Sequence, residues 1–301
     1  MSILWMHRQQ YNPLIFRHLA SYLIQSITMA NLHMKDRLSP YPGTTDVYRT
    51  IVPDEKVPWS VNWPDYKPVE YTAQKVLKNP PWADDVNTKK IKHYNELDGQ
   101  IDRRSFMGVY EIDEDTNRPK NPQGRMGISG RGLLGRWGPN HAGDSLVTRW
   151  SKHQRDSTQK VLEIILINRK DNGRLALPGG MIDPGEHALA AVKREFIEEA
   201  LNSNPDVIKQ VDKLFKKANS VYKGYVDDPR NTDNAWTETE AINVHDETGE
   251  LTKDLELEAG DDATNVKWVR LDHHYNVHAS HESIIQMVIK QHGGYEYWRD
   301  N

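Results

Sequence analysis

The sequence predicts an α/β (α+β) sandwich with an additional irregular lobe on its N-terminal side. The apolar run VLEIILIN at residues 161–168 is typical of a buried strand, and a glutamate-rich segment of helical periodicity follows it at residues 187–201. Several short β-rich segments come after that helix. Because strands precede and follow a central helix, the helix is expected to pack against a sheet.

Three parts are expected along the chain: an extension over residues 1–40, a first lobe over 41–150 and a second domain over 151–301. Residues 1–35 contain no Asp or Glu, and apolar side chains recur there at helical spacing. An acid-free amphipathic segment is typical of a mitochondrial transit peptide. An ordinary N-terminal helix or a short vector-derived helix has the same pattern, so a mitochondrial and a cytoplasmic location both stay open.

The first lobe is rich in Pro, Trp, Tyr and Gly. Its prolines exclude a long helix, because proline lacks the backbone N–H and clashes with the preceding turn; they stand at positions 53, 58, 64, 68, 80 and 81. Short strands joined by irregular, aromatic-rich segments are expected instead. This lobe is expected to pack on the second half of the chain rather than to fold alone.

The second half is more regular. After the first strand, a turn at residues 171–173 and a short strand at 174–177 predict a hairpin, which Pro178-Gly179-Gly180 ends. The helix at 187–201 is followed by further predicted elements: a helix at 211–218, strands at 221–226, 237–244 and 266–271, and a final helix at 282–292.

Composition excludes several functions. The 301 residues contain no cysteine, which removes disulfides, thiol nucleophiles and Cys-ligated zinc. The net charge of -4 gives no basic excess, so a nucleic-acid partner is not expected. No run of about 18 apolar residues occurs, so no membrane-spanning helix is expected.

The glutamates of the central helix share one side. Glu195, Glu198 and Glu199 are spaced i, i+3, i+4, beside an apolar arc formed by Leu189, Val192, Phe196 and Ala200. Carboxylates that converge at a partly buried edge repel one another, and a hard divalent cation such as Mg²⁺ relieves that repulsion. The alternative is a solvated helix whose charges Lys193 and Arg194 offset.

The residues in front of the helix favour the metal site. Gly179, Gly180 and Gly185 permit backbone conformations and approaches that other residues resist, and Asp183-Pro184-Gly185 is a turn signal. Glu186 falls at the helix entrance, where a carboxylate complements free N–H groups. A strand, a glycine turn, a loop and a carboxylate-faced helix together predict a platform for a metal ion and phosphate groups.

The spacing of these residues resembles the Nudix box. The pattern is Gly180, five residues, Glu186, seven residues, Arg194-Glu195-Phe196, one residue, Glu198-Glu199. The resemblance implies a Nudix fold in which Glu195, Glu198 and Glu199 hold Mg²⁺, with Mn²⁺ as an alternative. It further implies that Arg194 orients the glutamates and that Glu198 or Glu199 is the catalytic base. Leu201-Asn202 departs from the family pattern at the end of the helix, where packing is expected to differ.

Other segments resemble the ADP-ribose pyrophosphatases of the Nudix-type motif 9 group. They include VYKGYVDDPRNTDNAW at residues 221–236 and GRGLLGRWGPNHAGDSLVTRW at 130–150, and they also resemble the C-terminal domain of melastatin-type cation channels. The resemblance implies hydrolysis of ADP-ribose to AMP and ribose 5-phosphate by a catalytic domain at 151–301, with the lobe at 41–150 lining the cleft. The alternative is an ADP-ribose-binding sensor with little or no turnover, against which the intact glutamates argue.

The resemblance also implies substrate-binding residues. Asp228 and Arg230 are expected to contact the ligand, although an Asp–Arg pair in a solvated turn is the simpler interpretation of these two residues alone. His281 falls where the family has a histidine near the nucleotide, whereas His278 replaces a frequent tyrosine. Asn140 belongs to a loop that lines the cleft or is a structural turn. Trp236 is expected in the core, and a monomer is expected unless the chain is part of a larger channel.

Overall fold

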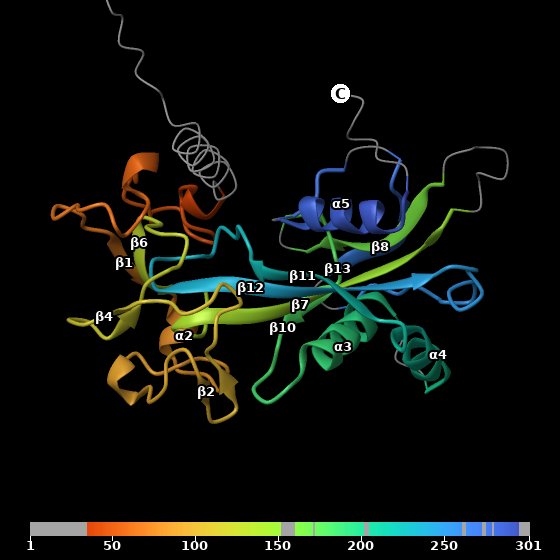
Figure 1. Cartoon of the computed structure of the whole chain (residues 1–301), viewed down its shortest axis with the longest axis horizontal. Helices are drawn as coiled ribbons and strands as arrows, with labels where there is room; N and C mark the ends of the chain where they lie inside the picture. The colour runs from red at the N-terminus through yellow and green to blue at the C-terminus, as the bar shows by residue number, and fades with distance from the viewer. Residues whose placement is uncertain are drawn as a thin grey trace, which may run out of the picture. The chain divides into compact units, whose positions relative to one another are not determined.

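A mixed sheet lies at the centre of the second half of the chain (Figure 1). In the computed structural model its strands follow the order β11 (Asn219–Tyr225), β12 (Ala235–Asp246), β7 (Gly138–Trp150), β8 (Leu162–Arg169) and β13 (Ala263–Arg270). The short strands β10 (Gly179–Met181) and β9 (Leu175–Ala176) pair with β7 and β8, respectively. Strands β7 and β12 run parallel, and the other pairs within this sheet are antiparallel.

The structure describes residues 35–151, 160–170, 172–201, 205–260, 263–272, 275–278 and 280–294. The segment in which the transit peptide is predicted falls, up to residue 34, outside the described residues, as does Asn202. Within the described part of the chain, no helix has the length and apolar character needed to cross a membrane.

The apolar run at residues 161–168 forms strand β8, which is buried on both faces. Ile165 and Ile167 pack into one buried cluster, whereas Ile164 and Leu166 pack into another on the opposite face. Successive strand residues point to opposite faces, so a strand covered on both sides reads as a continuous apolar run. The predicted hairpin is confirmed, since Ile167 pairs with Ala176 of β9.

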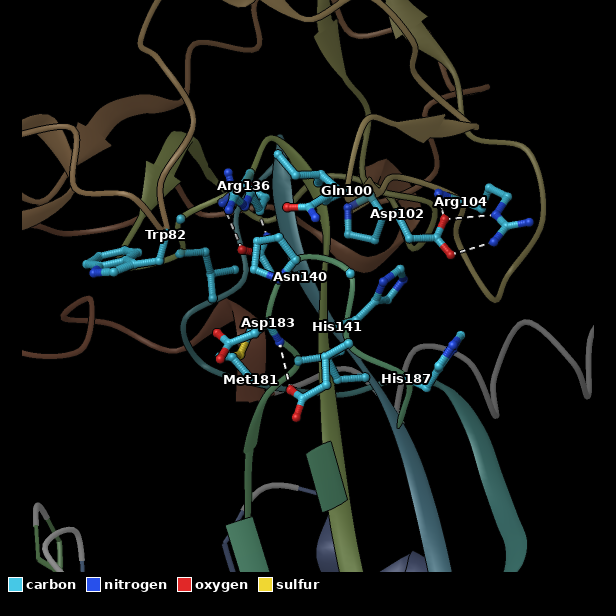
Figure 2. Close-up of a pocket in the computed structure, with 18 of the residues that line it drawn as sticks. Trp82, Gln100, Asp102, Arg104, Arg136, Asn140, His141, Met181, Asp183 and His187 are labelled. Atoms are coloured by element: carbon cyan, nitrogen blue, oxygen red, sulfur yellow. Dashed lines mark hydrogen bonds and ion pairs between the residues drawn. The ribbon is translucent and has the colours of Figure 1, made fainter. Parts of the chain in front are cut away.

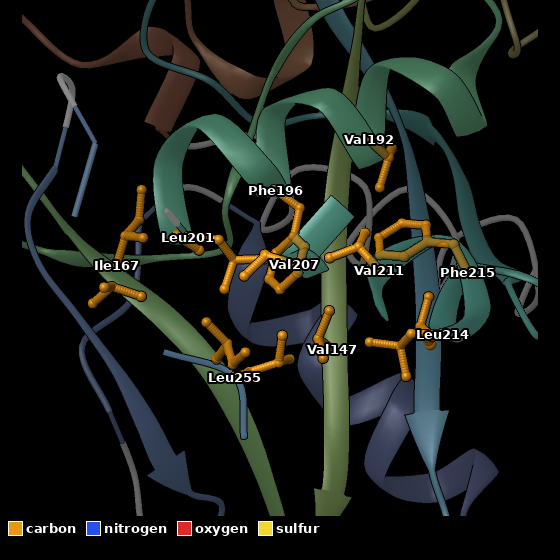
Figure 3. Packing of buried hydrophobic residues seen from close by; sticks show 14 of the residues in the cluster. Val147, Ile167, Val192, Phe196, Leu201, Val207, Val211, Leu214, Phe215 and Leu255 are labelled. Atoms are coloured by element: carbon orange, nitrogen blue, oxygen red, sulfur yellow. The ribbon is translucent and has the colours of Figure 1, made fainter. Parts of the chain in front are cut away.

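Helices α3 (Ala188–Ala200) and α4 (Pro205–Phe215) cover one face of the sheet (Figure 1). Figure 3 shows Phe196 and Phe215 packed above Val147, and the two rings lie 5.9 Å apart. Full burial of one such side chain stabilises a fold by about 1.5–3 kcal/mol. Leu201, where the sequence departs from the family pattern, is buried in this same cluster.

Helix α5 (His281–Gln291) covers the other face of the sheet, as Figure 1 shows. Ile284, Ile285 and Val288 pack there with β8 side chains. The two helical layers and the sheet between them confirm the predicted sandwich. The glutamate-faced helix begins and ends within one residue of its predicted bounds.

The first lobe is irregular, as predicted. Its only α-helix within the described residues is α2 (Gln74–Leu77), and β1 (Val69–Thr72) pairs in parallel with β6 (Ile128–Gly132). It also contains two small hairpins, β2 (Leu97–Asp98) with β3 (Ile101–Asp102) and β4 (Ile112–Asp113) with β5 (Arg118–Pro119), and two 3-10 turns, η2 (Asp54–Lys56) and η3 (Thr88–Lys90). A further 3-10 turn, η1 (Lys35–Arg37), precedes the lobe.

Strand β7 connects the two halves. It lies within the predicted first lobe at residues 41–150, yet it pairs with β12 over its length, from Gly138 opposite Ala235 to Arg149 opposite Asp246. The first lobe therefore shares a strand with the central sheet. The division into parts at residues 40 and 150 stays a prediction.

Candidate active site

The glycines ahead of helix α3 allow side chains to approach the backbone of β10. A Cβ atom at Gly180 would lie 2.4 Å from a carboxylate oxygen of Glu195, and one at Gly179 would lie 2.7 Å from Oδ1 of Asp144. No real side chain tolerates such distances. Gly180 thus provides the space into which the Glu195 carboxylate fits, which is the physical reason for the glycine pair that the sequence places before the glutamates.

Arg194 lies among the glutamates of the helix and its entrance. Its guanidinium donates to Glu186 at 2.9 Å, to Glu195 at 2.7 Å and to Glu198 at 3.2 Å. Hydrogen bonding to Arg194 lowers the pKa of the Glu186 carboxyl. Burial raises the pKa of the Glu195 carboxyl, and the hydrogen bond from Arg194 offsets part of that rise. The predicted orienting role of Arg194 is consistent with these contacts.

Glu199 takes a different position on the helix. Its carboxylate accepts a hydrogen bond of 2.8 Å from the backbone N–H of Gly179. Glu198 is the outermost of the three, because 55% of its side chain is exposed, compared with 14% for Glu195. The three glutamates therefore share one side of the helix, as their spacing predicts, with Glu199 at the sheet and Glu198 facing solvent.

Two cavities meet at this carboxylate cluster. The first cavity has a volume of about 670 Å³ and extends from β10 to the first lobe, where Trp82, Gln100 and Arg104 line it (Figure 2). The second cavity, of about 480 Å³, lies over the sheet. Three residues line both cavities, and these are Met181, Glu195 and Arg230. A ligand with two bulky halves can place one half in each cavity and its linkage beside Glu195.

Asp228 and Arg230 form a pair at the second cavity. The Arg230 guanidinium donates to the two Asp228 oxygens at 2.9 and 2.6 Å. Burial alone would raise the pKa of the Asp228 carboxyl, yet the charge of Arg230 outweighs it and lowers that pKa to about 2. Asp228 is only 2% exposed, so the pair is not a solvated turn. Both residues line the second cavity, as a ligand-contacting role requires.

His281 and His278 line the same cavity. Nδ1 of His281 accepts a hydrogen bond of 3.0 Å from the Leu177 N–H, and its Nε2 lies 3.7 Å from Asp144. Burial, with the nearby charge of Arg169, lowers the pKa of His281 to about 3 and that of His278 to about 4. Both imidazoles are therefore neutral near pH 7, and the Nδ1 contact places the His281 proton on Nε2.

Asp144 is a site residue that sequence reasoning missed. Burial raises the pKa of its carboxyl to about 6, although a hydrogen bond of 2.6 Å from Thr239 opposes that rise. It lines the second cavity because β10 pairs with β7, which brings Gly179 opposite Asp144. Only the β10–β7 pairing identifies Asp144 as a residue of this site. Nothing in the local motif GDSL distinguishes this carboxylate from a surface one.

Asn140 holds a turn. Its amide oxygen accepts from the Arg136 N–H at 2.8 Å, and its amide nitrogen donates to the carbonyls of Arg136 and Gly138. The residue lines the first cavity, but these bonds occupy its amide group. The geometry favours the structural turn, and a ligand contact by Asn140 stays a prediction. Trp236 is fully buried, which confirms its place in the core.

The carboxylates fit a hard divalent cation by their chemistry. Glu195, Glu198 and Glu199 offer oxygen atoms only, which Mg²⁺ and Mn²⁺ prefer, and the space left by Gly180 gives Glu195 room at the sheet. In the described residues no three acidic or histidine side chains converge as a ready metal site. Arg194 contacts one oxygen of Glu195 and one of Glu198, so the second oxygen of each carboxylate would be the one to meet a metal ion.

Comparison with known proteins identifies the family of this chain. The NUDIX domain family matches residues 154–288, and the NUDT9-like N-terminal domain family matches residues 52–138. The chain therefore belongs to the Nudix hydrolase family, for which dependence on a divalent metal is typical. Within that family it belongs to the NUDT9-like group, whose two characteristic regions it carries in order.

Three relatives illustrate this membership. The chain is 50% identical over 278 residues to the mitochondrial ADP-ribose pyrophosphatase of Rattus norvegicus, a match that covers 87% of this chain and 79% of the relative. It is 42% identical to putative nudix hydrolase 6 of Caenorhabditis elegans, covering 88% and 99% of the two chains. It is 47% identical to a transient receptor potential cation channel subfamily M member-like 2 of Nematostella vectensis, covering 88% of this chain but 18% of the channel.

Proposed function

We propose that this protein hydrolyses the pyrophosphate bond of ADP-ribose and releases AMP and ribose 5-phosphate. The observation that carries the proposal is the position of Glu195 at the wall shared by two cavities. The pyrophosphate of ADP-ribose joins an adenosine to a second ribose, so a carboxylate cluster between two cavities lies where the scissile bond would be held. The 50% identity to the rat ADP-ribose pyrophosphatase supports this substrate.

We infer that Mg²⁺ is the metal, with Mn²⁺ as an alternative, and that Glu195, Glu198 and Glu199 hold it. The bound ion would offset negative charge on the pyrophosphate and lower the pKa of the attacking water. Arg194 keeps the carboxylates apart and oriented through its hydrogen bonds to Glu195 and Glu198. Either Glu198 or Glu199 serves as the base that accepts the proton of that water.

The chain's own side chains then bind the two halves of the substrate. Arg230 lines both cavities, so its guanidinium is placed to contact a phosphate at their junction. Asp228 holds that guanidinium in place. His281 is neutral and donates from Nε2, a group suited to a sugar or phosphate oxygen.

The alternative function is an ADP-ribose-binding sensor without turnover. The match to a cation channel favours it, because the chain resembles 18% of that protein's length. The complete set of Nudix glutamates favours the enzyme. A mitochondrial location is proposed from the rat relative, with a cytoplasmic one as the alternative, and a monomeric state is proposed for the isolated chain.

The deciding experiment measures AMP release from ADP-ribose with and without Mg²⁺, for wild type and for the Glu198→Gln/Glu199→Gln double variant. We expect Mg²⁺-dependent release that falls by about two to four powers of ten in the double variant. Glu250→Gln is the control, because Glu250 is an exposed residue paired with Lys253 outside both cavities. Saturable binding of ADP-ribose by wild type without any AMP release would contradict the hydrolase and support the sensor function.

A further inference from the structure

A buried carboxylate lies behind the wall of the first cavity, outside the Nudix box. Glu238 of β12 is fully buried, and its oxygens accept hydrogen bonds from Ser105 Oγ at 2.5 Å, the Phe106 N–H at 2.6 Å and Trp236 Nε1 at 2.7 Å. Burial alone would raise the pKa of this carboxyl, but these donors and His141 outweigh it and lower that pKa. Glu238 is therefore an anion that ties the first lobe to the sheet.

His141 of β7 lies opposite Glu238 in the parallel pairing of the two strands. Its Nε2 is 3.8 Å from a Glu238 oxygen and is buried without a hydrogen-bond partner. Its ring stacks on Phe106, with centroids 4.5 Å apart and planes 14° from parallel. The stack fixes the plane of the imidazole, and the carboxylate fixes which edge faces inward.

This arrangement determines the hydrogen-bonding character of the opposite ring edge. A carboxylate beside Nε2 favours the tautomer that carries its proton on Nε2, which leaves Nδ1 as an acceptor in the neutral ring. Among the residues that the structure describes, none forms a hydrogen bond with Nδ1. His141 lines the first cavity, between the Gln100–Arg104 segment and the Asp183–His187 segment in Figure 2. Nδ1 of His141 is thus an oriented hydrogen-bond acceptor at the wall of the first cavity, and no described residue donates to it.

We propose that His141 is a specificity-determining residue of the ADP-ribose site, whose Nδ1 accepts a hydrogen bond from a hydroxyl or amine of the substrate half that enters the first cavity. Glu238 is its positioning residue. This inference rests on the proposed function and goes beyond it, since it assigns a substrate contact to a residue outside the Nudix box. The ligand donors with this chemistry are the ribose hydroxyls and the adenine amine.

Two substitutions at His141 separate the acceptor from the stacked ring. His141→Phe keeps a ring against Phe106 but removes the acceptor, whereas His141→Asn loses the ring but keeps a carbonyl oxygen near the position of Nδ1. We expect His141→Phe to raise KM for ADP-ribose about tenfold with kcat changed by less than about threefold, and His141→Asn to keep KM within about threefold. A raised KM in His141→Asn with a nearly unchanged KM in His141→Phe would show that only the ring stack matters, and it would overturn the proposal.

Product inhibition distinguishes the two sources of the donor. AMP carries the adenine amine and its own ribose, and ribose 5-phosphate carries the other sugar. His141→Phe should weaken inhibition by one product about tenfold and leave the other within about twofold. Weakened inhibition by AMP places the adenosine half in the first cavity, and weakened inhibition by ribose 5-phosphate places the terminal ribose there. Unchanged inhibition by both products would overturn the proposal.

Further variants keep the test decisive. His141→Gln directs its amide toward Glu238 and offers no acceptor at the Nδ1 position, so it should behave as His141→Phe does and can replace that variant if it does not fold. His93→Asn is the matched control, because His93 is an exposed histidine that lies outside both cavities and faces Glu96. Wild type that neither cleaves nor binds ADP-ribose would overturn the proposed function and this inference together. Normal wild-type turnover with an unchanged KM in His141→Phe would overturn this inference alone.

Discussion

Gly180 and Glu195 occupy a single space: the carboxylate of Glu195 lies where the side chain of any other residue at position 180 would begin. A Cβ atom at Gly180 would stand 2.4 Å from Cδ and from one oxygen of that carboxylate. This contact joins β10 to helix α3 at the point where the two cavities meet. The backbone at Gly180 does not adopt a conformation that only glycine favours. The close approach of the Glu195 carboxylate is what requires a glycine there.

Gly180→Ala should abolish most activity with little loss of stability. The added methyl group meets the flexible end of Glu195, which can swing away at small cost, but the carboxylate then leaves the shared wall. We expect kcat to fall at least about a hundredfold, on the scale of a removed catalytic group, as measured by AMP release. Gly294→Ala is the control, since a Cβ there makes only ordinary contacts at 3.5 Å. Activity within threefold of wild type would contradict the role assigned to Gly180.

Arg194→Lys should lower kcat without unfolding the protein. Lysine offers one ammonium group, which cannot reproduce the guanidinium contacts to Glu186, Glu195 and Glu198. About a tenfold to hundredfold loss in kcat is expected, because carboxylates that are misplaced by a small distance lose much of their effect. Thermal unfolding should stay close to that of wild type, since the side chain is 31% exposed. A lysine variant with wild-type kcat would show that orientation by Arg194 is dispensable.

Removal of Arg230 should destabilise the fold as well as inactivate the protein. Arg230→Met leaves the buried Asp228 carboxylate without its partner, which should cost about 2 kcal/mol once the partial exposure of the arginine is considered. The double variant Asp228→Asn/Arg230→Met should recover most of that stability in urea unfolding. It should not recover activity. Recovery of both would mean that the pair is structural only.

Asp233 should contribute a loss of stability as pH rises from 3.8 to about 7, opposite in sign to the contribution of the buried His278 and His281, whose lowered pKa values favour the fold as pH rises toward 6.5. Burial raises the pKa of this carboxyl to about 7, against an ordinary value of 3.8. The folded state therefore holds a proton that the unfolded state has lost, so the stabilisation is full below pH 3.8 and is lost as pH rises toward 7.

Asp233→Asn tests this pH dependence directly. The unfolding free energy of the variant, measured by urea titration, should rise relative to that of wild type between pH 5 and 8, because its amide does not titrate. Asp54→Asn, at an exposed residue paired with Arg37, should keep the wild-type slope. An unchanged slope in Asp233→Asn would place the titration elsewhere, with Asp36 the first residue to test, since burial raises its pKa to about 8.

The sequence by itself determined the elements whose signals are local. The apolar run of β8 requires burial on both faces, and the spacing of Glu195, Glu198 and Glu199 defines one side of a helix wherever that helix packs. The glycines before the helix and the glutamates on it identified the catalytic pattern, because both depend on residues within about twenty positions of one another. Proline spacing likewise predicted the irregular first lobe.

Only the tertiary structure decided which distant residues join that pattern. Asp144 reaches the site because β10 pairs with β7, and His141 meets Glu238 because β7 and β12 run side by side in a parallel register across 97 positions of sequence. Strand register and the packing of the first lobe are set by many weak contacts at once, and a single sequence carries no local signal for them. The amide of Asn140 shows the converse, since it lies at the cavity yet is bound to its own turn.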